Sequence, residues 1–332
     1  MSLDNAVSKP HEQLAVRLAD DLVAVDAMIR ARMSSQYAPR IPQVTAHLID
    51  AGGKRLRPML TLAAARLCGY TGEYHIHLAT CVEFIHTATL LHDDVVDDSK
   101  QRRGRPTANL LWDNQSSVLV GDYLFARSFQ LMVEPGNLQV LDILANASAT
   151  IAEGEVLQMT AARNLETSEA DYIQIVRGKT AALFSAATQA GAVIAGADEE
   201  TVAALFAYGD ALGIAFQMVD DLLDYGDGES IGKNAGDDLR EGKLTLPVIR
   251  ALSKADAEER AFWTRTIEKA RVEEGDLETA RAIMDRHAAL EETRQEALAW
   301  AAKAKAALDV CPASDIRGML VDLADYVVAR IS

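Results

Sequence analysis

Two aspartate-rich segments with the same spacing constrain this chain more than any of its other features. The first follows an uncharged run, Phe84 to Leu91, and places carboxylates at Asp93, Asp94 and Asp97. If the run is helical, Asp93 and Asp97 share one face, and Asp94 lies about a quarter turn away. The spacing therefore predicts a helix that ends in a cluster of carboxylates.

The second segment, FQMVDDLLD, begins at Phe216 and repeats the arrangement with Asp220, Asp221 and Asp224. Cations follow both clusters, namely Arg102, Arg103 and, after the second, Lys233. A solvated acidic helix end would explain one cluster, but two of equal spacing, each after an apolar run, are hard to produce by chance. We therefore interpret the two clusters as one site.

Both clusters carry an electrostatic cost that a ligand must offset. Carboxylates at i and i+4 repel, and acidic side chains in the last turn oppose the helix dipole, each effect costing about a few tenths of a kcal/mol. Hard divalent cations take oxygen ligands, and magnesium commonly joins one or two carboxylates to a substrate phosphate. The paired clusters thus favour a divalent cation, with magnesium and a phosphorylated ligand as the natural combination.

The rest of the 332-residue chain favours an all-α fold in one domain, residues 1–332. Glycine (20) and proline (8) are scarce, and no linker or composition break divides the sequence. Apolar residues recur at i and i+4, whereas alternating β-branched runs are hard to find. Among the helices, we expect one amphipathic helix from His11 to Met33 and another from about Ile76 to Asp97.

Residues 180–197 carry no charge, which meets a length criterion for a membrane-spanning helix. Their composition is mostly Ala, Gly, Thr and Ser, which favours the central helix of a thick bundle instead. The net charge of −16 argues against nucleic acid and anionic membranes as partners. Three cysteines without metal-like spacing, and no basic region followed by an apolar core near residue 1, predict a cytoplasmic protein without disulfides.

An acidic protein can hold phosphates only through metal ions and local cations. In GGKRLRP, Gly52 and Gly53 precede Lys54 and Arg57, and two cations three apart at a helix start can grip an anion together with the helix amides. A loop with basic surface residues is the alternative interpretation.

Other polar residues also point toward the clusters. His86 lies two turns before Asp93 on nearly the same face, and both a structural and a substrate-binding role are open. Lys179 precedes the uncharged run. It could contact an anion, or its ammonium group could reach the surface along an apolar stem. Glu153, Glu155 and Gln158 interrupt an apolar helix, which favours a cavity lined by polar groups. The charged loop after the second cluster is a candidate lid.

With these residues in view, the sequence resembles the trans-isoprenyl diphosphate synthases of the polyprenyl synthetase family. The resemblance covers nearly the whole chain beyond residue 40 and rests on GGKRLRP, DDVVD followed by RRG, the KT pair, FQMVDDLLD, and GK with the later EGKLTLP. The segment FIHTATLLHDDVVD is similar to the long-chain octaprenyl to decaprenyl branch. The family implies a single large helical bundle around a deep central cavity.

Carried over by position, the resemblance implies the roles of individual residues. About three magnesium ions are expected. They would be coordinated by Asp93, Asp97 and Asp220, with Asp94, Asp221 and Asp224 completing the clusters. The allylic diphosphate would be held by Arg102, Lys179 and Lys233, with Thr180 and Gln217 beside the substrate. The diphosphate of isopentenyl diphosphate would be held by Lys54, Arg57, His86 and Arg103.

The resemblance also implies the chemistry. Magnesium would stabilise the leaving diphosphate, the allylic substrate would ionise, and the double bond of isopentenyl diphosphate would attack the allylic cation before a proton is lost. No side chain stands out as the general base, and the departing pyrophosphate is the candidate. The product would serve as a quinone side chain, and the enzyme would be a homodimer, both by family analogy.

Product length in the family depends on residues that precede the first cluster. Bulky side chains about five positions before it end chain growth early. This chain has Ala88 there, with Ile85 and Cys81 further back, and Met132 matches a position near the tunnel floor of long-chain relatives. The implied product is about C40 to C50. We hypothesise that Met132→Ala lengthens the product and that Ala88→Phe shortens it.

Three alternatives differ in what they require. A geranylgeranyl or farnesyl diphosphate synthase would share the chemistry but stop earlier. A class I terpene cyclase would need no second diphosphate site, against which GGKRLRP and the arginine pair argue. A non-catalytic subunit of a heteromeric synthase normally lacks one aspartate cluster, whereas this chain has both.

Overall fold

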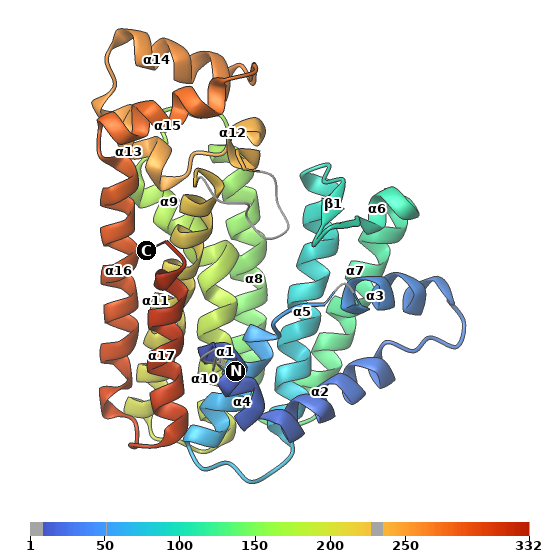
Figure 1. Ribbon diagram of the computed structural model, residues 1–332. Coiled ribbons are helices and arrows are strands. Elements are labelled where there is room, and N and C mark those ends of the chain that lie inside the picture. Colours follow the sequence, from blue (N-terminus) through green and yellow to red (C-terminus); the bar gives the residue numbers. More distant parts are fainter. Residues whose placement is uncertain (1–8, 51, 227–234, 332) are drawn as a thin grey trace, which may run out of the picture.

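The fold is built almost entirely from helices. The computed structural model describes residues 9–50, 52–226 and 235–331 (Figure 1). Within these ranges the only strands are β1 (Gln101–Arg102) and β2 (Arg105–Pro106), which pair antiparallel in a short ribbon. The predicted all-α fold is therefore confirmed.

The first helices are α1 (Pro10–Arg17), α2 (Ala19–Arg32), α3 (Arg40–Asp50), α4 (Leu56–Leu67), α5 (Tyr74–Val96), α6 (Ala108–Leu111), α7 (Asn114–Val133), α8 (Leu138–Ala161), α9 (Glu169–Val176) and the π-helix η1 (Arg177–Ala181). They are followed by α10 (Ala182–Ile194), α11 (Glu199–Asp224), α12 (Asp237–Glu241), α13 (Leu246–Lys254), α14 (Ala257–Trp263), the π-helix η2 (Thr264–Glu268), α15 (Asp276–Arg286), α16 (Ala289–Ala307), the 3-10 helix η3 (Leu308–Val310) and α17 (Asp315–Ala329).

The expected single helix from His11 to Met33 is wrong in one respect. At Leu18 the backbone leaves helical geometry (φ −108°, ψ 19°), and α2 begins at the next residue. Leu14 and Leu18 are both buried, so the chain changes direction at Leu18 while its apolar side chains stay in the core.

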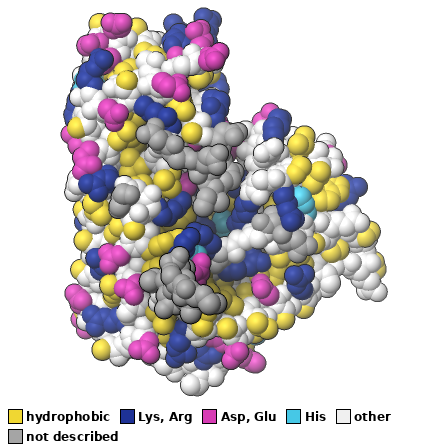
Figure 2. All heavy atoms as spheres, in the orientation of Figure 1, with side chains coloured by type: hydrophobic (Ala, Val, Ile, Leu, Met, Phe, Trp, Pro, Cys, Tyr) yellow, Lys and Arg dark blue, Asp and Glu magenta, His cyan; other side chains and the backbone are white. Residues whose placement is uncertain are grey.

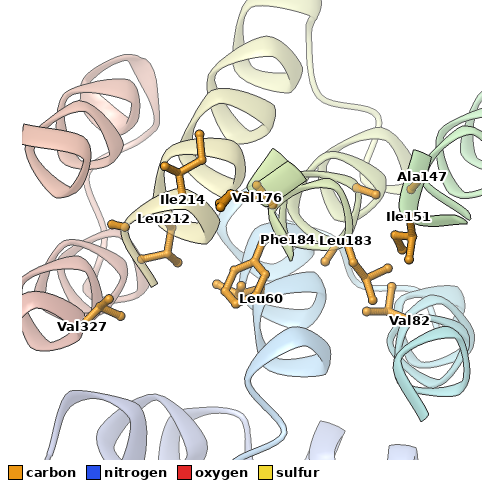
Figure 3. Packing of buried hydrophobic residues seen from close by; sticks show 14 of the residues in the cluster. Leu60, Val82, Ala147, Ile151, Val176, Leu183, Phe184, Leu212, Ile214 and Val327 are labelled. Atoms are coloured by element: carbon orange, nitrogen blue, oxygen red, sulfur yellow. The ribbon is translucent and has the colours of Figure 1, made fainter. Parts of the chain in front are cut away.

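Helix α10 lies at the centre of the bundle, where it packs against α4, α5, α8 and α11. Its apolar side chains are buried, and Figure 3 shows Leu183 and Phe184 among the side chains of neighbouring helices. Small residues allow the close packing: a Cβ added at Gly191 would lie 2.5 Å from the Thr61 carbonyl oxygen. The central-helix interpretation is thus confirmed for Ala182–Ile194, whereas Thr180 and Ala181 belong to η1 and residues 195–197 follow the helix.

By length and composition, one helix in the described part of the chain could cross a membrane. It is α11, and 56% of its apolar window is buried inside the protein. Core packing therefore accounts for its apolar character.

Helices α5 and α11 carry the two aspartate clusters at their C-terminal ends. Asp97 caps α5, and Asp224 is the last residue of α11. In Figure 1 the β1–β2 ribbon and α12, which follow these two helices in the chain, lie at the same end of the molecule.

Candidate active site

The two aspartate clusters border one cavity of about 690 Å³. Its polar lining includes Asp97, Asp220, Asp221, Lys179, Thr180, Gln217, Gln158 and Lys243. Figure 2 shows Lys and Arg side chains beside the hollow in the middle of this face. The fold thus brings together carboxylates and cations that are more than a hundred positions apart in the chain.

In the first cluster the three carboxylates have different surroundings. Asp94 is fully buried, and both Nε and Nη2 of Arg102 lie 2.8 Å from its Oδ1. Asp93 Oδ2 lies 3.9 Å from the Nζ of Lys179. Asp97 lines the cavity. The structure therefore turns Asp94 toward Arg102 and Asp93 toward Lys179, whereas Asp97 lines the cavity.

The second cluster is divided in a similar way. The Tyr172 hydroxyl donates to Asp221 Oδ2 at 2.6 Å, and Gln217 Nε2 donates to Oδ1 at 2.8 Å. Asp224 accepts hydrogen bonds from two backbone N–H groups at the start of α12 and so anchors that helix. Asp220 lines the cavity. Asp94 and Asp224 are thus used for internal bonding, Asp221 is hydrogen-bonded at the cavity wall, and Asp97 and Asp220 line the cavity.

Two of these carboxyl groups have raised pKa values. Burial raises the pKa of Asp93 to about 6, although the charge of Lys179 opposes the change. Burial raises the pKa of Asp221 to about 7, and the charge of Asp238 adds to the rise. These carboxyl groups are therefore costly to ionise unless more positive charge is nearby. A bound cation would supply that charge, so the raised pKa values are consistent with a cation-binding site.

The donor set also fits magnesium with a bound phosphate. Among the described residues, no three His, Cys, Asp or Glu side chains converge to form a complete metal site. Magnesium is usually bound through one or two carboxylates, with phosphates and water completing the octahedron. Asp93 and Asp97 from α5 and Asp220 from α11 would supply such partial ligand sets.

Lys179 is positioned by a local distortion of the helix. It lies in the π-helix η1, a form that frequently occurs at functional sites. Gly154 and Gly178 bring α8 and η1 into backbone contact, because a Cβ added at Gly154 would lie 2.7 Å from the Lys179 nitrogen. This contact places the Lys179 Nζ 2.8 Å from Glu155 Oε2. On the next residue, the Thr180 hydroxyl donates to Gln217 Oε1 at 2.8 Å.

The GGKRLRP segment supplies a second group of cations beside α5. Arg57 Nη1 donates to His86 Nε2 at 3.2 Å, and its guanidinium lies 4.7 Å from the ring centroid of Phe184. Burial, reinforced by the charge of Arg57, lowers the pKa of His86 well below its usual value, so the imidazole is neutral. Arg103 lies against Gly53, where an added Cβ would come within 2.8 Å of its guanidinium.

Some site residues escaped prediction from the sequence. Tyr172 bonds to Asp221 although it lies 49 positions earlier, and Lys243 lines the cavity from the loop after α12, where the sequence suggested only a charged lid. The nearby carboxylates of Asp238 and Glu241 raise the pKa of Lys243 despite its burial. Lys233, expected to bind the allylic diphosphate, lies outside the described residues.

The residues expected to set product length are all buried. Ala88 and Ile85 on α5 and Met132 on α7 have no exposed surface. Contacts of Leu91 with Ser117 and of Cys81 with Ser128 show that α5 and α7 run antiparallel. At 1.5 Å per residue, Ala88 is roughly 8 Å below Asp93, and Met132 lies opposite a part of α5 roughly 20 Å below it.

The comparisons with known proteins agree with this geometry. The family model described as polyprenyl synthetase matches residues 38–284. The chain is 44% identical to the octaprenyl diphosphate synthase of Escherichia coli (strain K12) over 96% of this chain and 98% of that protein. It is 68% identical to a decaprenyl diphosphate synthase from Rhodobacter capsulatus, whose crystal structure superposes with a TM-score of 0.94 over 97% of this chain and 99% of that one.

A third relative comes from Caulobacter crescentus CB15. Its polyprenyl synthase, crystallised with calcium and isoprenyl diphosphate, is 50% identical with a TM-score of 0.92, over 96% of this chain and 97% of that one. A family model that matches most of the chain, together with full-length relatives of the same fold, shows that the protein belongs to the polyprenyl synthetase family of prenyltransferases.

Proposed function

We propose that this enzyme condenses an allylic diphosphate with successive molecules of isopentenyl diphosphate to give an all-trans polyprenyl diphosphate of eight to ten isoprene units. The relatives named octaprenyl and decaprenyl diphosphate synthase support this length. The structural observation that carries the proposal is that the ends of α5 and α11 bring both aspartate clusters to one cavity, with the small, buried Ala88 on α5 five positions before Asp93.

Each part of the cavity has a distinct task in this proposal. Asp93, Asp97 and Asp220 would hold about three magnesium ions together with the diphosphate oxygens. Magnesium, when bound, neutralises charge that grows on the leaving diphosphate. The allylic diphosphate would be oriented by Arg102, Lys179 and Lys233, with Thr180 and Gln217 beside it. In this arrangement Glu155 keeps Lys179 extended toward Asp93 until the diphosphate enters.

The second diphosphate would bind beside α5. Lys54, Arg57 and Arg103 supply positive charge there, and neutral His86 accepts from Arg57 and thereby orients it. The Phe184 ring lies under Arg57, and the Phe216 ring, 5.6 Å from Phe184, would extend it into an apolar wall. An allylic cation would otherwise react with water, so a wall that excludes water serves the reaction.

The assembly and location of the enzyme are part of the same proposal. Helix α7 and the start of α8 expose a row of apolar side chains: Val118, Leu119, Phe129, Val133 and Leu138. We propose that two copies pair through this face, that residues 1–332 act as one domain, and that the enzyme works in the cytoplasm for a quinone-producing pathway. Light scattering should give the mass of a dimer, and Leu119→Asp should reduce it to that of a monomer.

A product-length assay tests the function. Purified protein is incubated with magnesium, farnesyl diphosphate and labelled isopentenyl diphosphate, and dephosphorylated products are separated by reversed-phase chromatography. Products of eight to ten units support the long-chain assignment. Products of three or four units would instead identify a medium-chain synthase, and no incorporation at all would favour a non-catalytic subunit.

A further inference from the structure

A buried glutamate lies beneath the cations of the GGKRLRP segment and has no part in the roles above. Glu83 is on α5, one turn before His86, and is 6% exposed. Its Oε1 accepts a hydrogen bond from Arg55 Nη1 at 2.5 Å. Because residues three apart share a helix face, Glu83 and His86 are both directed toward the GGKRLRP segment, where their partners are Arg55 and Arg57.

The surroundings of Glu83 are strongly cationic. A small cavity beside it is lined by Arg55, Arg102 and Arg103. Guanidinium groups that are gathered away from water repel one another. Burial and the charge of Arg103 lower the pKa of Arg57 to about 10, whereas the charge of Glu83 counteracts that change. Glu83 therefore supplies the buried negative charge that offsets this repulsion.

The backbone at Arg55 shows what the Glu83 carboxylate holds in place. Arg55 precedes α4 and adopts the left-handed conformation (φ 49°, ψ 33°). For a residue other than glycine this conformation costs on the order of 1 kcal/mol or more, so surrounding contacts must maintain it. Arg55 has two acidic partners, and Glu83 is the buried one, since Asp26 is 3.4 Å from Nε and largely exposed. Arg55 is thereby directed toward α5.

We propose that Glu83 is a positioning residue for the isopentenyl diphosphate site. By holding Arg55, it fixes the turn from which Lys54 and Arg57 project, and its charge keeps Arg57 and Arg103 close together before the diphosphate binds. Glu83 acts through these side chains and does not contact the substrate. The inference rests on the proposed function and concerns the diphosphate that the aspartate clusters do not hold.

Steady-state kinetics with each substrate varied in turn tests the role. Glu83→Ala should raise the KM for isopentenyl diphosphate about tenfold or more, because the cations lose their anchor. The KM for farnesyl diphosphate should change less than about twofold, since that substrate binds at the aspartate clusters. Glu83→Gln keeps an oxygen acceptor for Arg55 and should give an intermediate KM. If the alanine variant does not fold, the glutamine variant still provides the comparison between substrates.

Glu259 offers a matched control. It is 4% exposed, accepts from Arg286 at 2.5 Å and lies 2.7 Å from His287 Nε2, and it lines neither cavity. Glu259→Ala also removes a buried carboxylate with cationic partners. It should destabilise the protein and leave both KM values unchanged.

Direct binding separates this inference from the proposed function. Isopentenyl diphosphate is titrated calorimetrically into the magnesium-free protein in EDTA, where Glu83→Ala should weaken binding by the same factor as it raises the KM. If the wild type is active and Glu83→Ala leaves both KM values unchanged, or raises both equally, the role of Glu83 is overturned while the proposed function stands. A wild type that neither binds nor incorporates isopentenyl diphosphate overturns the proposed function, and the inference with it.

Discussion

Tyr172 and Asp221 form a hydrogen bond between α9 and α11, in which the phenol donates to the carboxylate at 2.6 Å and both side chains are buried. Gln217 donates to the other carboxylate oxygen and accepts from Thr180. Two donors, one on each oxygen, satisfy this buried carboxyl group and restrict its rotation. The network therefore fixes the second aspartate cluster relative to α9 and η1.

Tyr172→Phe should destabilise the protein and reduce turnover. The Asp221 carboxylate would lose one donor while remaining buried, which costs about 1–3 kcal/mol. Urea unfolding followed by circular dichroism measures the loss. Turnover should fall because Asp221 is no longer held beside Asp220.

Tyr208→Phe is the matched control, since its buried hydroxyl donates to the Leu320 carbonyl at 2.8 Å, away from the aspartate clusters. It should cost a comparable amount of stability with turnover unchanged. Equal losses of turnover in the two variants would contradict the positioning of Asp221 by Tyr172.

Stability without magnesium should depend on pH through Asp93. Burial raises the pKa of Asp93 to about 6 in the folded state, whereas an unfolded aspartate titrates near 3.9. Between these values the folded state binds more protons, so the contribution of Asp93 to stability falls as pH rises from about 4 to 6 and is constant above. The free energy of unfolding is measured in EDTA for the wild type and for Asp93→Asn. The difference, wild type minus variant, should decrease over that pH range.

Added magnesium should reverse the trend. Because it binds the ionised carboxylates in competition with protons, it should stabilise the wild type more at pH 8 than at pH 5.5. A difference between wild type and Asp93→Asn that stays constant with pH would show that the folded and unfolded states titrate alike at this position.

Product length should respond to the column of side chains below Asp93. Ala88→Phe introduces a ring about 8 Å below the cluster and should shorten the product, at a cost of about 1–3 kcal/mol from overpacking. Met132→Ala opens space deeper in the bundle and should lengthen the product, at a cost of about 2–5 kcal/mol. Chromatography of the dephosphorylated products measures the product length of both variants.

Met284→Ala controls for the loss of packing, because Met284 on α15 is equally buried and lies outside the α5–α7 contact. It should lose stability and make the wild-type product. Unchanged products in both Ala88→Phe and Met132→Ala would rule out growth of the chain along α5.

The helices that carry the clusters could be predicted because their signals are local. Asp93 and Asp97 follow an apolar run at helical spacing, and the observed α5 differs from the expected helix by only a few residues at its ends. Which aspartates of each cluster form internal hydrogen bonds, and which line the cavity, could not be predicted in this way. Asp221 is bonded to Tyr172 only because α9 packs against α11, and no periodicity within either segment encodes that contact.

The same limit applies to the π-helix at Lys179. The sequence RGKTA has no marker for a change of helical pitch, and the observed geometry coincides with the contact between Gly178 and Gly154 of another helix. Contacts of this kind depend on how the helices pack, which a single sequence does not specify.

Gly154→Ala should therefore damage catalysis through backbone packing alone. An added Cβ would lie 2.7 Å from the Lys179 nitrogen and 2.8 Å from Gly178 Cα, so α8 and η1 must move apart. That shift would lengthen the contact between Glu155 and Lys179 and displace the Lys179 ammonium from the allylic diphosphate. We expect a lower kcat and a loss of stability of about 1–3 kcal/mol, typical of overpacking.

Gly318→Ala tests whether this effect is specific to the helix crossing. Gly318 lies within α17 and has nothing within 4 Å of an added Cβ. Alanine there should stabilise the helix by up to about 1 kcal/mol and leave kcat unchanged, because alanine has the higher helix propensity. If Gly154→Ala also raised stability and preserved kcat, the backbone contact between α8 and η1 would not be what positions Lys179.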